Sequence, residues 1–247
     1  MKYSFNKIVL AAAALVSMAA ISCTKSFDEK IEVKTDLSGN STVQVYLATV
    51  GASRNYVYVD AKPVTGAALT SGSLFPASGI GFSVPSGLRD MMVRDTLSTT
   101  TQTQLAFANN LQPGMGYTVF VYDTINAVKQ RTVQTTLVVP SDTSCRIRFA
   151  NFAYNGLAVT PSVDIVSTGK NEIVATNVPY TGVTEFIAHP TGLSGEGFQV
   201  REAGTSNILA TVTSVSLVAK RSYTVIYRGS HRNSTSTGRA VSVFINN

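Results

Sequence analysis

The sequence predicts an all-β protein made of two tandem antiparallel β-sandwich modules of the immunoglobulin-like or transthyretin-like type. The composition favours strands, because Thr, Ser and Val are frequent, 44% of the residues are hydrophobic and only 14% are charged. Short strand-like runs alternate with turn residues, and no helical period follows the leader. The same landmarks recur in one order after Pro140, which indicates an internal duplication.

The N-terminus has the pattern of a secretory signal, which we assign to residues 1–22. Lys2 and Lys7 precede an apolar stretch, Ile8 to Ile21, that is too short to span a bilayer as a mature helix. The sequence Ala20-Ile21-Ser22-Cys23 resembles a bacterial lipobox, which implies a lipid on Cys23 and anchoring in the outer membrane through that lipid. The alternative is an ordinary cleaved signal with a chance cysteine.

Residues 23–40 have the composition of a lipidated tether, with many charges and few apolar side chains. Asp28-Glu29 loosely resembles the acidic signal that sends Bacteroidota lipoproteins to the cell surface. A tether that faces the periplasm is the competing interpretation. We therefore expect an outer-membrane protein on one of these two faces.

The first module is predicted over residues 41–140. Val43, Val45 and Leu47 alternate with Gln44 and Tyr46, which predicts a half-buried strand. Further strand candidates are 56–59, 80–84, 90–93, 104–108, 117–122 and 132–138. A Gly-, Ser- and Pro-rich section, 62–79, is expected to form loops around a short strand.

The second module is predicted over residues 141–247, after the polar break at 140–143. Five landmarks of the first module return: 146–149 matches 43–46, 162–165 matches 56–59, 186–193 matches 82–88, 200–202 matches 93–95, and 223–224 matches 117–118. Residues 240–245 close this module as 132–138 close the first.

Each module carries a Leu six positions before a Tyr-Thr pair: Leu111 and Tyr117, then Leu217 and Tyr223. This spacing resembles the tyrosine corner of sandwich modules, in which the Tyr hydroxyl bonds the backbone just upstream. The second copy lacks the Pro-Gly that follows Leu111 and Gln112. The alternative is that both tyrosines simply fill strand positions.

The duplicated module resembles the domain of unknown function 4397 family, whose modules occur in Bacteroidota lipoproteins and other bacterial surface proteins. The resemblance covers roughly 42–122 and 145–229, and Arg146-Ile147-Arg148-Phe149-Ala150-Asn151 is its clearest part. It implies a β-sandwich outside the cytoplasm, with no established catalytic residue.

Little in the sequence indicates catalysis, and we predict a non-enzyme without cofactor or metal. His189 and His231 lack zinc-site spacing, and His189 matches Val84 of the first copy, which favours a structural role. Cys145 has no partner once Cys23 is lipidated and is expected to be a buried apolar residue. Removal of the leader leaves 18 basic against 14 acidic residues, dispersed in a way that does not indicate nucleic-acid binding.

Three functions remain open. The first is a non-catalytic lipoprotein that serves adhesion, envelope architecture or protein contact. The second is a glycan-binding accessory protein of a nutrient uptake system, for which we expect exposed aromatic contacts at Tyr56, Tyr58, Tyr154 and Tyr180. The third is a fimbrillin-like pilus subunit, which needs a displaceable end strand such as 240–245.

Overall fold

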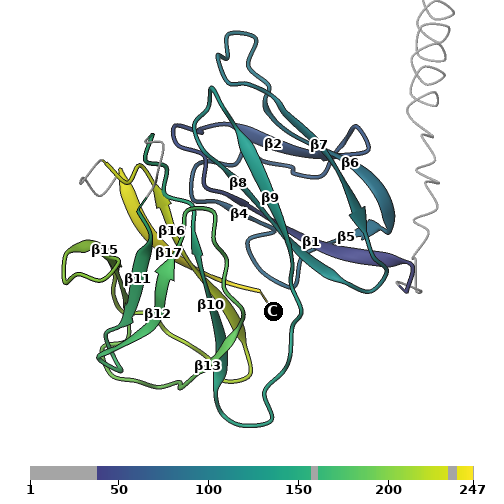
Figure 1. The fold of residues 1–247 in the computed structure, drawn as a ribbon. Coiled ribbons are helices and arrows are strands. Elements are labelled where there is room, and N and C mark those ends of the chain that lie inside the picture. Colours follow the sequence, from purple (N-terminus) through teal and green to yellow (C-terminus); the bar gives the residue numbers. More distant parts are fainter. Residues whose placement is uncertain (1–37, 157–160, 233–237, 247) are drawn as a thin grey trace, which may run out of the picture. The chain divides into compact units, whose positions relative to one another are not determined.

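A computed structural model describes residues 38–156, 161–232 and 238–246 (Figure 1). The secondary structure of these residues is entirely β, which confirms the predicted fold class. All of them belong to one compact unit, Asp36–Asn247. The strands form four sheets, two from each half of the chain.

The first sandwich has an inner and an outer sheet. The inner sheet has the order β4-β1-β8-β9, and β5 also pairs with β1. The outer sheet has the order β3-β2-β6-β7. Their bounds are β1 Asn40–Leu47, β2 Asn55–Val59, β3 Lys62–Pro63, β4 Leu74–Phe75, β5 Phe82–Pro85, β6 Gly87–Asp95, β7 Leu105–Leu111, β8 Gly116–Tyr122 and β9 Lys129–Gln134.

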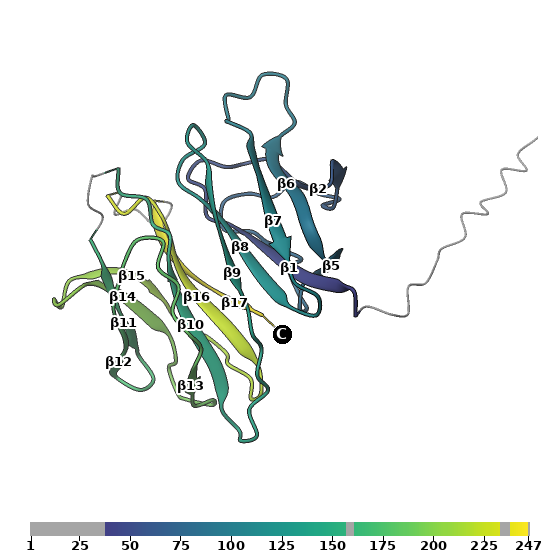
Figure 2. The same ribbon diagram turned by 45° about the vertical axis from the view of Figure 1, so that its right-hand side comes forward.

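The second sandwich repeats this plan. Its inner sheet is β13-β10-β16-β17 and its outer sheet is β12-β11-β14-β15 (Figure 2). Their bounds are β10 Cys145–Asn151, β11 Val163–Ser167, β12 Glu172–Val178, β13 Ile187–His189, β14 Phe198–Glu202, β15 Ile208–Val212, β16 Ser222–Gly229 and β17 Arg239–Ile245.

Each inner sheet contains one parallel pair within an otherwise antiparallel sandwich. Strand β1 runs parallel to β8, and β10 runs parallel to β16. The sequence did not predict these pairs, because alternation of apolar residues identifies a strand but not the direction of its neighbour.

The strand registers define which residues of the two halves are equivalent. Val43 pairs with Tyr117 as Ile147 pairs with Tyr223, so Gln44 is equivalent to Arg148. The sequence match placed Arg146 opposite Val43, one residue out of register. A slip of one residue exchanges the two faces of a strand, so this correction decides which side chains face the core.

Each sandwich has its own apolar core between its two sheets. In the first, Val43, Val45 and Leu47 pack against Val57 and Val93 of the outer sheet. In the second, Ile147 and Phe149 pack against Ile165, Phe198 and Val200. Alternating apolar side chains supply these cores, as expected for stacked sheets.

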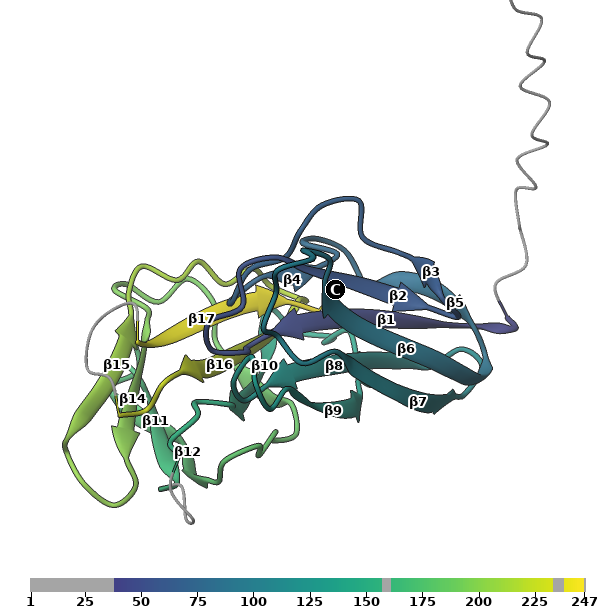
Figure 3. The same cartoon turned by 90° about the horizontal axis from the view of Figure 1, so that it is seen from above.

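The prediction that the strand at 43–47 is half-buried was wrong. Gln44 and Tyr46 are each 1% exposed, although they point away from the core of the first sandwich. They are covered because the inner sheets of the two sandwiches pack against each other, where β16 and β17 lie beside β1 (Figure 3). We call this contact the inter-sandwich interface.

A separate apolar cluster fills the inter-sandwich interface. It joins Tyr46, Ala48 and Phe120 of the first half to Ala150, Phe152, Ile226 and Phe244 of the second. Phe120 stacks on Phe152 with ring centroids 4.6 Å apart, and Tyr46 stacks on Phe244 at 4.9 Å. Such aromatic pairs add to the free energy gained by burying their area.

Buried polar groups border this cluster. Arg148, 2% exposed, donates through Nη2 to Thr118 Oγ1 at 2.9 Å and to Thr135 Oγ1 at 3.2 Å, both in the first half. Asn246 Nδ2 donates to Gln44 Oε1 at 2.9 Å. These bonds satisfy polar groups that would otherwise be costly to bury.

Candidate functional site

The outward face of the outer sheet in the first sandwich carries two of the predicted tyrosines. Tyr56 and Tyr58 alternate along β2 with buried Asn55, Val57 and Val59, so both rings point away from the core. Both are half-buried by their neighbours on this face. We call this surface, formed by β2, β6 and β7, the tyrosine face.

The neighbours on the tyrosine face follow from the register of β6. Arg94 lies opposite Tyr56 and Met92 lies opposite Tyr58. The guanidinium carbon of Arg94 lies 4.9 Å from the centroid of the Tyr58 ring, a cation–π contact. The aromatic rings are therefore bordered by a cation and a flexible thioether.

Arg94 has no hydrogen-bond or ion-pair partner among the described residues, and its Nε atom is buried. Its equivalent in the second sandwich, Arg201, donates through Nη2 to Gln199 Oε1 at 2.8 Å. Met92 stands where Gln199 stands, so Arg94 lacks that acceptor. A guanidinium that has no hydrogen-bond partner within the protein and lies beside aromatic rings is able to donate to an acceptor group of a ligand.

A depression of about 700 Å³ continues the tyrosine face over β6 and β7. Met92, Ala106 and Ala108 lie along it, and Asp60 and Asp90 stand at its rim. The small alanines of β7 leave this space open because they fill little volume above the sheet. Its size lies within the range of small-molecule sites, about 300–1,000 Å³.

The tyrosine face belongs to the first sandwich alone. The registers make Asp164 and Val166 the equivalents of Tyr56 and Tyr58. The Asp164 carboxylate accepts from the backbone N–H groups of Asn177 at 2.7 Å and Gly204 at 2.8 Å, so it serves to hold local backbone. The two copies have therefore diverged at the positions that face outward.

The other two tyrosines that we expected to contact a ligand lie elsewhere. Tyr180 packs edge-on against Tyr122 of the first sandwich, with ring centroids 5.8 Å apart. Burial raises the pKa of Tyr180 well above its ordinary value. Tyr154 is half-buried, and its backbone pairs with Ser230 in a parallel bridge. The structure thus separates these tyrosines from the pair on β2.

The tyrosines of the two repeated Leu-x5-Tyr segments make the backbone bonds that the corner interpretation requires. The Tyr117 hydroxyl accepts from the Gln112 N–H at 2.9 Å, and the Tyr223 hydroxyl accepts from the Val218 N–H at 2.9 Å. Leu111 and Leu217 are both buried. These four residues stabilise the strand entry in each sandwich.

A polar cluster inside the second sandwich brings together residues that the sequence treated as isolated. His189 Nε2 lies 2.8 Å from Glu196 Oε2, and Ser167 Oγ donates to Glu196 Oε1 at 3.0 Å. The His189 and Glu196 side chains are 1% and 4% exposed. Sequence reasoning missed Glu196, because the glycine-rich segment 192–197 gives no signal that this carboxylate turns inward; the segment connects β13 of the inner sheet to β14 of the outer sheet.

The electrostatics of this cluster indicate a structural role. Burial opposes ionisation of Glu196, but bonds from His189, the Gly197 N–H and Ser167 hold the pKa of its carboxyl below the ordinary value. Burial raises the pKa of the nearby Cys145 thiol to about 11, so the thiol is protonated at neutral pH. His189 therefore orients a carboxylate that is already saturated with donors, rather than activating a nucleophile.

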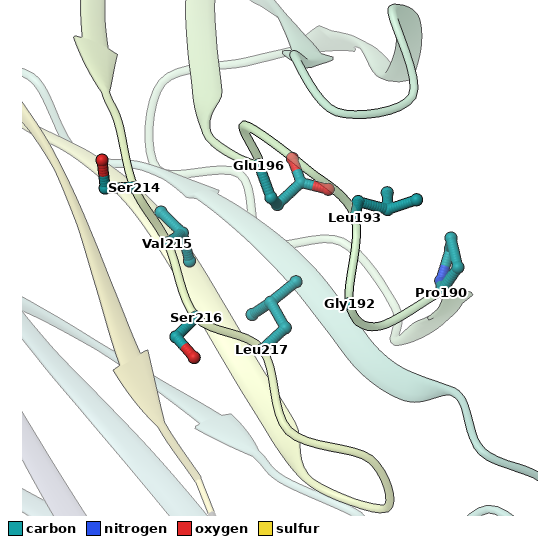
Figure 4. A pocket seen from close by; sticks show the side chains of 8 residues that line it. All are labelled: Pro190, Gly192, Leu193, Glu196, Ser214, Val215, Ser216 and Leu217. Atoms are coloured by element: carbon teal, nitrogen blue, oxygen red, sulfur yellow. The ribbon is translucent and has the colours of Figure 1, made fainter.

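A small pocket of about 230 Å³ adjoins this cluster (Figure 4). It lies between the loop that carries Pro190, Leu193 and Glu196 and the segment 214–217. Glu196 lines it, and both carboxylate oxygens of Glu196 are already engaged by His189, Ser167 and Gly197. The pocket is smaller than the depression on the tyrosine face, and the carboxylate of Glu196 already has hydrogen-bond partners within the protein.

The described residues contain no group of three or more His, Cys, Asp or Glu side chains placed to hold a metal ion. The part of the chain that the structure describes also has no helix with the length and hydropathy of a membrane span. Cys23 and most of the tether, 23–37, lie outside the described residues, so the lipid anchor stays a prediction.

Comparisons with known proteins do not identify the chain. No family model matches, and no curated protein matches. Among solved structures, one described as alpha-glucan binding by a streptococcal virulence factor is similar with a TM-score of 0.24 and 11% identity, over 83% of this chain and 97% of that chain. A TM-score of 0.24 is too low to transfer a fold or a ligand.

Proposed function

We propose that this chain is a non-catalytic, lipid-anchored protein of the outer membrane whose contact surface is the tyrosine face. One observation carries the proposal: Tyr56, Tyr58 and the unpartnered Arg94 gather beside an open depression on one face of the first sandwich. An accessible surface of this kind is a typical binding site, because aromatic rings and arginine dominate the binding energy of recognition surfaces.

Two ligand classes fit this surface. The first is a protein, which corresponds to a role in adhesion or envelope architecture. The second is a glycan, which the mixed chemistry of the face supports. A pyranose ring stacks its C–H face on an aromatic ring, while its hydroxyls need both donors and acceptors.

The charges around the depression favour the glycan. Arg94 supplies free donors, and the exposed carboxylate of Asp90 has no side-chain partner in the described part of the chain. Asp60 is already paired with Arg89 at 2.9 Å. A face with carboxylates at the depression and a guanidinium beside Tyr58 suits a neutral, hydroxyl-rich ligand better than a strongly charged one.

A pilus subunit that donates its last strand has less support. Strand β17 pairs along its whole length with β16 of its own sandwich. The residue that follows it, Asn246, is fully buried in the inter-sandwich interface. Release of β17 would expose this interface as well as the second core.

The test is a glycan array followed by calorimetry with the tether-free protein. We expect binding of a neutral oligosaccharide by the wild type and a loss of about fivefold or more in affinity for Tyr58→Ala, since stacking on an aromatic ring is worth about 1 kcal/mol or more. Tyr180→Phe is the matched control, because Tyr180 lies away from the face.

Three outcomes separate the ligand classes. Binding that is lost in Tyr58→Ala and kept in Tyr180→Phe supports the glycan. An array without binders, together with a protein partner whose cross-links map to β2 and β6, supports the protein-contact role. Binding of either class that is unchanged by Tyr56→Ala, Tyr58→Ala and Arg94→Gln refutes the tyrosine face as the contact surface.

A further inference from the structure

The inter-sandwich interface has a reciprocal pattern of contacts. Arg148 of the second half bonds Thr135 of the first, and Gln44 of the first half bonds Asn246 of the second. The registers make Gln44 equivalent to Arg148 and Thr135 equivalent to Asn246. Position i therefore contacts position j in both directions, which is the signature of a two-fold symmetric dimer interface.

The apolar contacts follow the same reciprocity. Tyr46 stacks on Phe244, and the equivalents of these residues in the other halves are Ala150 and Val133. All four belong to the apolar cluster of the interface or pack against it. Each sandwich thus uses the same patch of its inner sheet to contact the other.

The side chains at these equivalent positions are no longer alike. Phe120 stacks on Phe152, whereas their equivalents are Ile226 and Ala48. One side of the pseudo-two-fold axis is thus built from aromatic rings, Tyr46, Phe120, Phe152 and Phe244, and the other side from smaller residues. A pair of two first sandwiches or of two second sandwiches would form neither ring stack.

The polar groups add a second restriction. A pair of two second sandwiches would bury two Arg148 guanidinium groups in one interface. In the present pair, one guanidinium is surrounded by Thr118, Thr135 and Thr224. A second buried cation without a carboxylate is costly, so this substitution acts against the wrong pairing.

We propose that the inner sheets form a self-sufficient, heterotypic interface derived from a symmetric dimer of one module. The first sandwich binds the second without the segment that joins them, and neither sandwich binds a copy of itself. The inference does not depend on the ligand of the tyrosine face, because that face lies on the outer sheet.

The experiment is to cut the connecting segment in the folded full chain. Residues 136–144 connect Thr135, which stays with the first half, to β10, and Val138 and Val139 within them are 60% and 64% exposed. A specific protease site placed there allows cleavage after folding. Native mass spectrometry and size-exclusion chromatography with light scattering then report whether the two halves stay together. A dilution series measures the dissociation constant of the cleaved complex.

We expect the cleaved wild type to remain a 1:1 complex of the two halves. Phe120→Ala should raise the dissociation constant about 30-fold or more, because Phe120 is 0% exposed at the centre of the interface, as hot-spot residues are. The uncut variant should keep the elution volume of the wild type, since Phe120 is not part of the first sandwich's own core. Tyr58→Ala is the matched control on the outer sheet and should leave the complex intact.

Three results would overturn the proposal. The halves of the wild type separate or aggregate on cleavage, so the interface is not self-sufficient. The cleaved halves redistribute into dimers of one kind, so the interface is not heterotypic. Phe120→Ala and Tyr58→Ala have the same effect on the cleaved complex, so association does not depend on the stacked rings.

Discussion

Arg148 allows a sharp test of what the buried polar network does. Its side chain is 2% exposed, and burial lowers the pKa of the guanidinium from 12.5 to about 10. No described carboxylate lies within ion-pair distance of it. At about 1.4 kcal/mol per pH unit, keeping the charge in this place costs about 3 kcal/mol.

The hydrogen bonds of Arg148 offset this cost. It donates to Thr224, Thr118 and Thr135, and each bond contributes about 1 kcal/mol or somewhat more. Its three acceptors keep other partners without it, because Thr118 and Thr135 bond each other at 2.8 Å and Thr224 donates to Asn246 at 2.7 Å. Removal of the guanidinium therefore leaves no buried hydroxyl unpaired.

We expect Arg148→Met to change the free energy of unfolding by no more than about 1 kcal/mol. The apolar side chain removes the hydrogen bonds of the guanidinium and its desolvation cost together, and these two contributions nearly cancel. Arg148→Ala should cost about 2–4 kcal/mol, because it also removes the buried aliphatic stem and leaves a cavity. Urea unfolding of both variants measures the difference. An Arg148→Met variant as unstable as Arg148→Ala would refute the argument.

Three further predictions follow from the corners, the anchor and the buried cluster. Tyr117→Phe should lower the free energy of unfolding by about 1 kcal/mol, and Tyr223→Phe by at least as much because Tyr223 is more buried. Urea unfolding measures both changes, and unchanged stability of both variants would mean that the two tyrosines only fill strand positions. Cys23→Ala should move the protein from the membrane fraction to the soluble fraction, and retention in the membrane would contradict the lipid anchor. The lowered pKa of Glu196 means that its contribution to stability is present above about pH 4.5 and is lost as the pH falls below that value. Glu196→Gln should therefore weaken the fall of the melting temperature at acid pH. An unchanged fall would contradict the stabilising role of the Glu196 carboxylate.

Local patterns were sufficient to predict most of the strands and the two corners, although β12 and β15 were not predicted. Alternating Val43, Val45 and Leu47 mark a core-facing row whatever the neighbouring strand is. The Leu-x5-Tyr spacing identifies a bond between residues five apart, as between Tyr117 and Gln112, which a local sequence signal can specify. These features depend on the conformation of one segment, and the sequence expresses them directly.

Contacts between the halves could not be predicted in the same way. Gln44 and Arg148 look like solvent-facing strand residues, because their burial comes from the inner sheet of the other sandwich and not from their own segment. The unequal fates of Tyr58 and Tyr180 have the same origin, since one lies on an uncovered face and the other against Tyr122. Glu196 was missed because its partner His189 requires the loop between them to fold back.

The parallel pairs determine when this protein is able to fold. Val43 and Tyr117 are neighbours in the sheet but lie 74 positions apart in the sequence, and Ile147 and Tyr223 lie 76 positions apart. Neither inner sheet is complete until nearly the whole of its module has been made, and the bond from Asn246 to Gln44 joins the two extremes of the described chain. Such distant pairings form slowly. We therefore expect each module to fold only after its late strands have been made, which suits a protein whose leader is predicted to direct it across a membrane as an extended polypeptide.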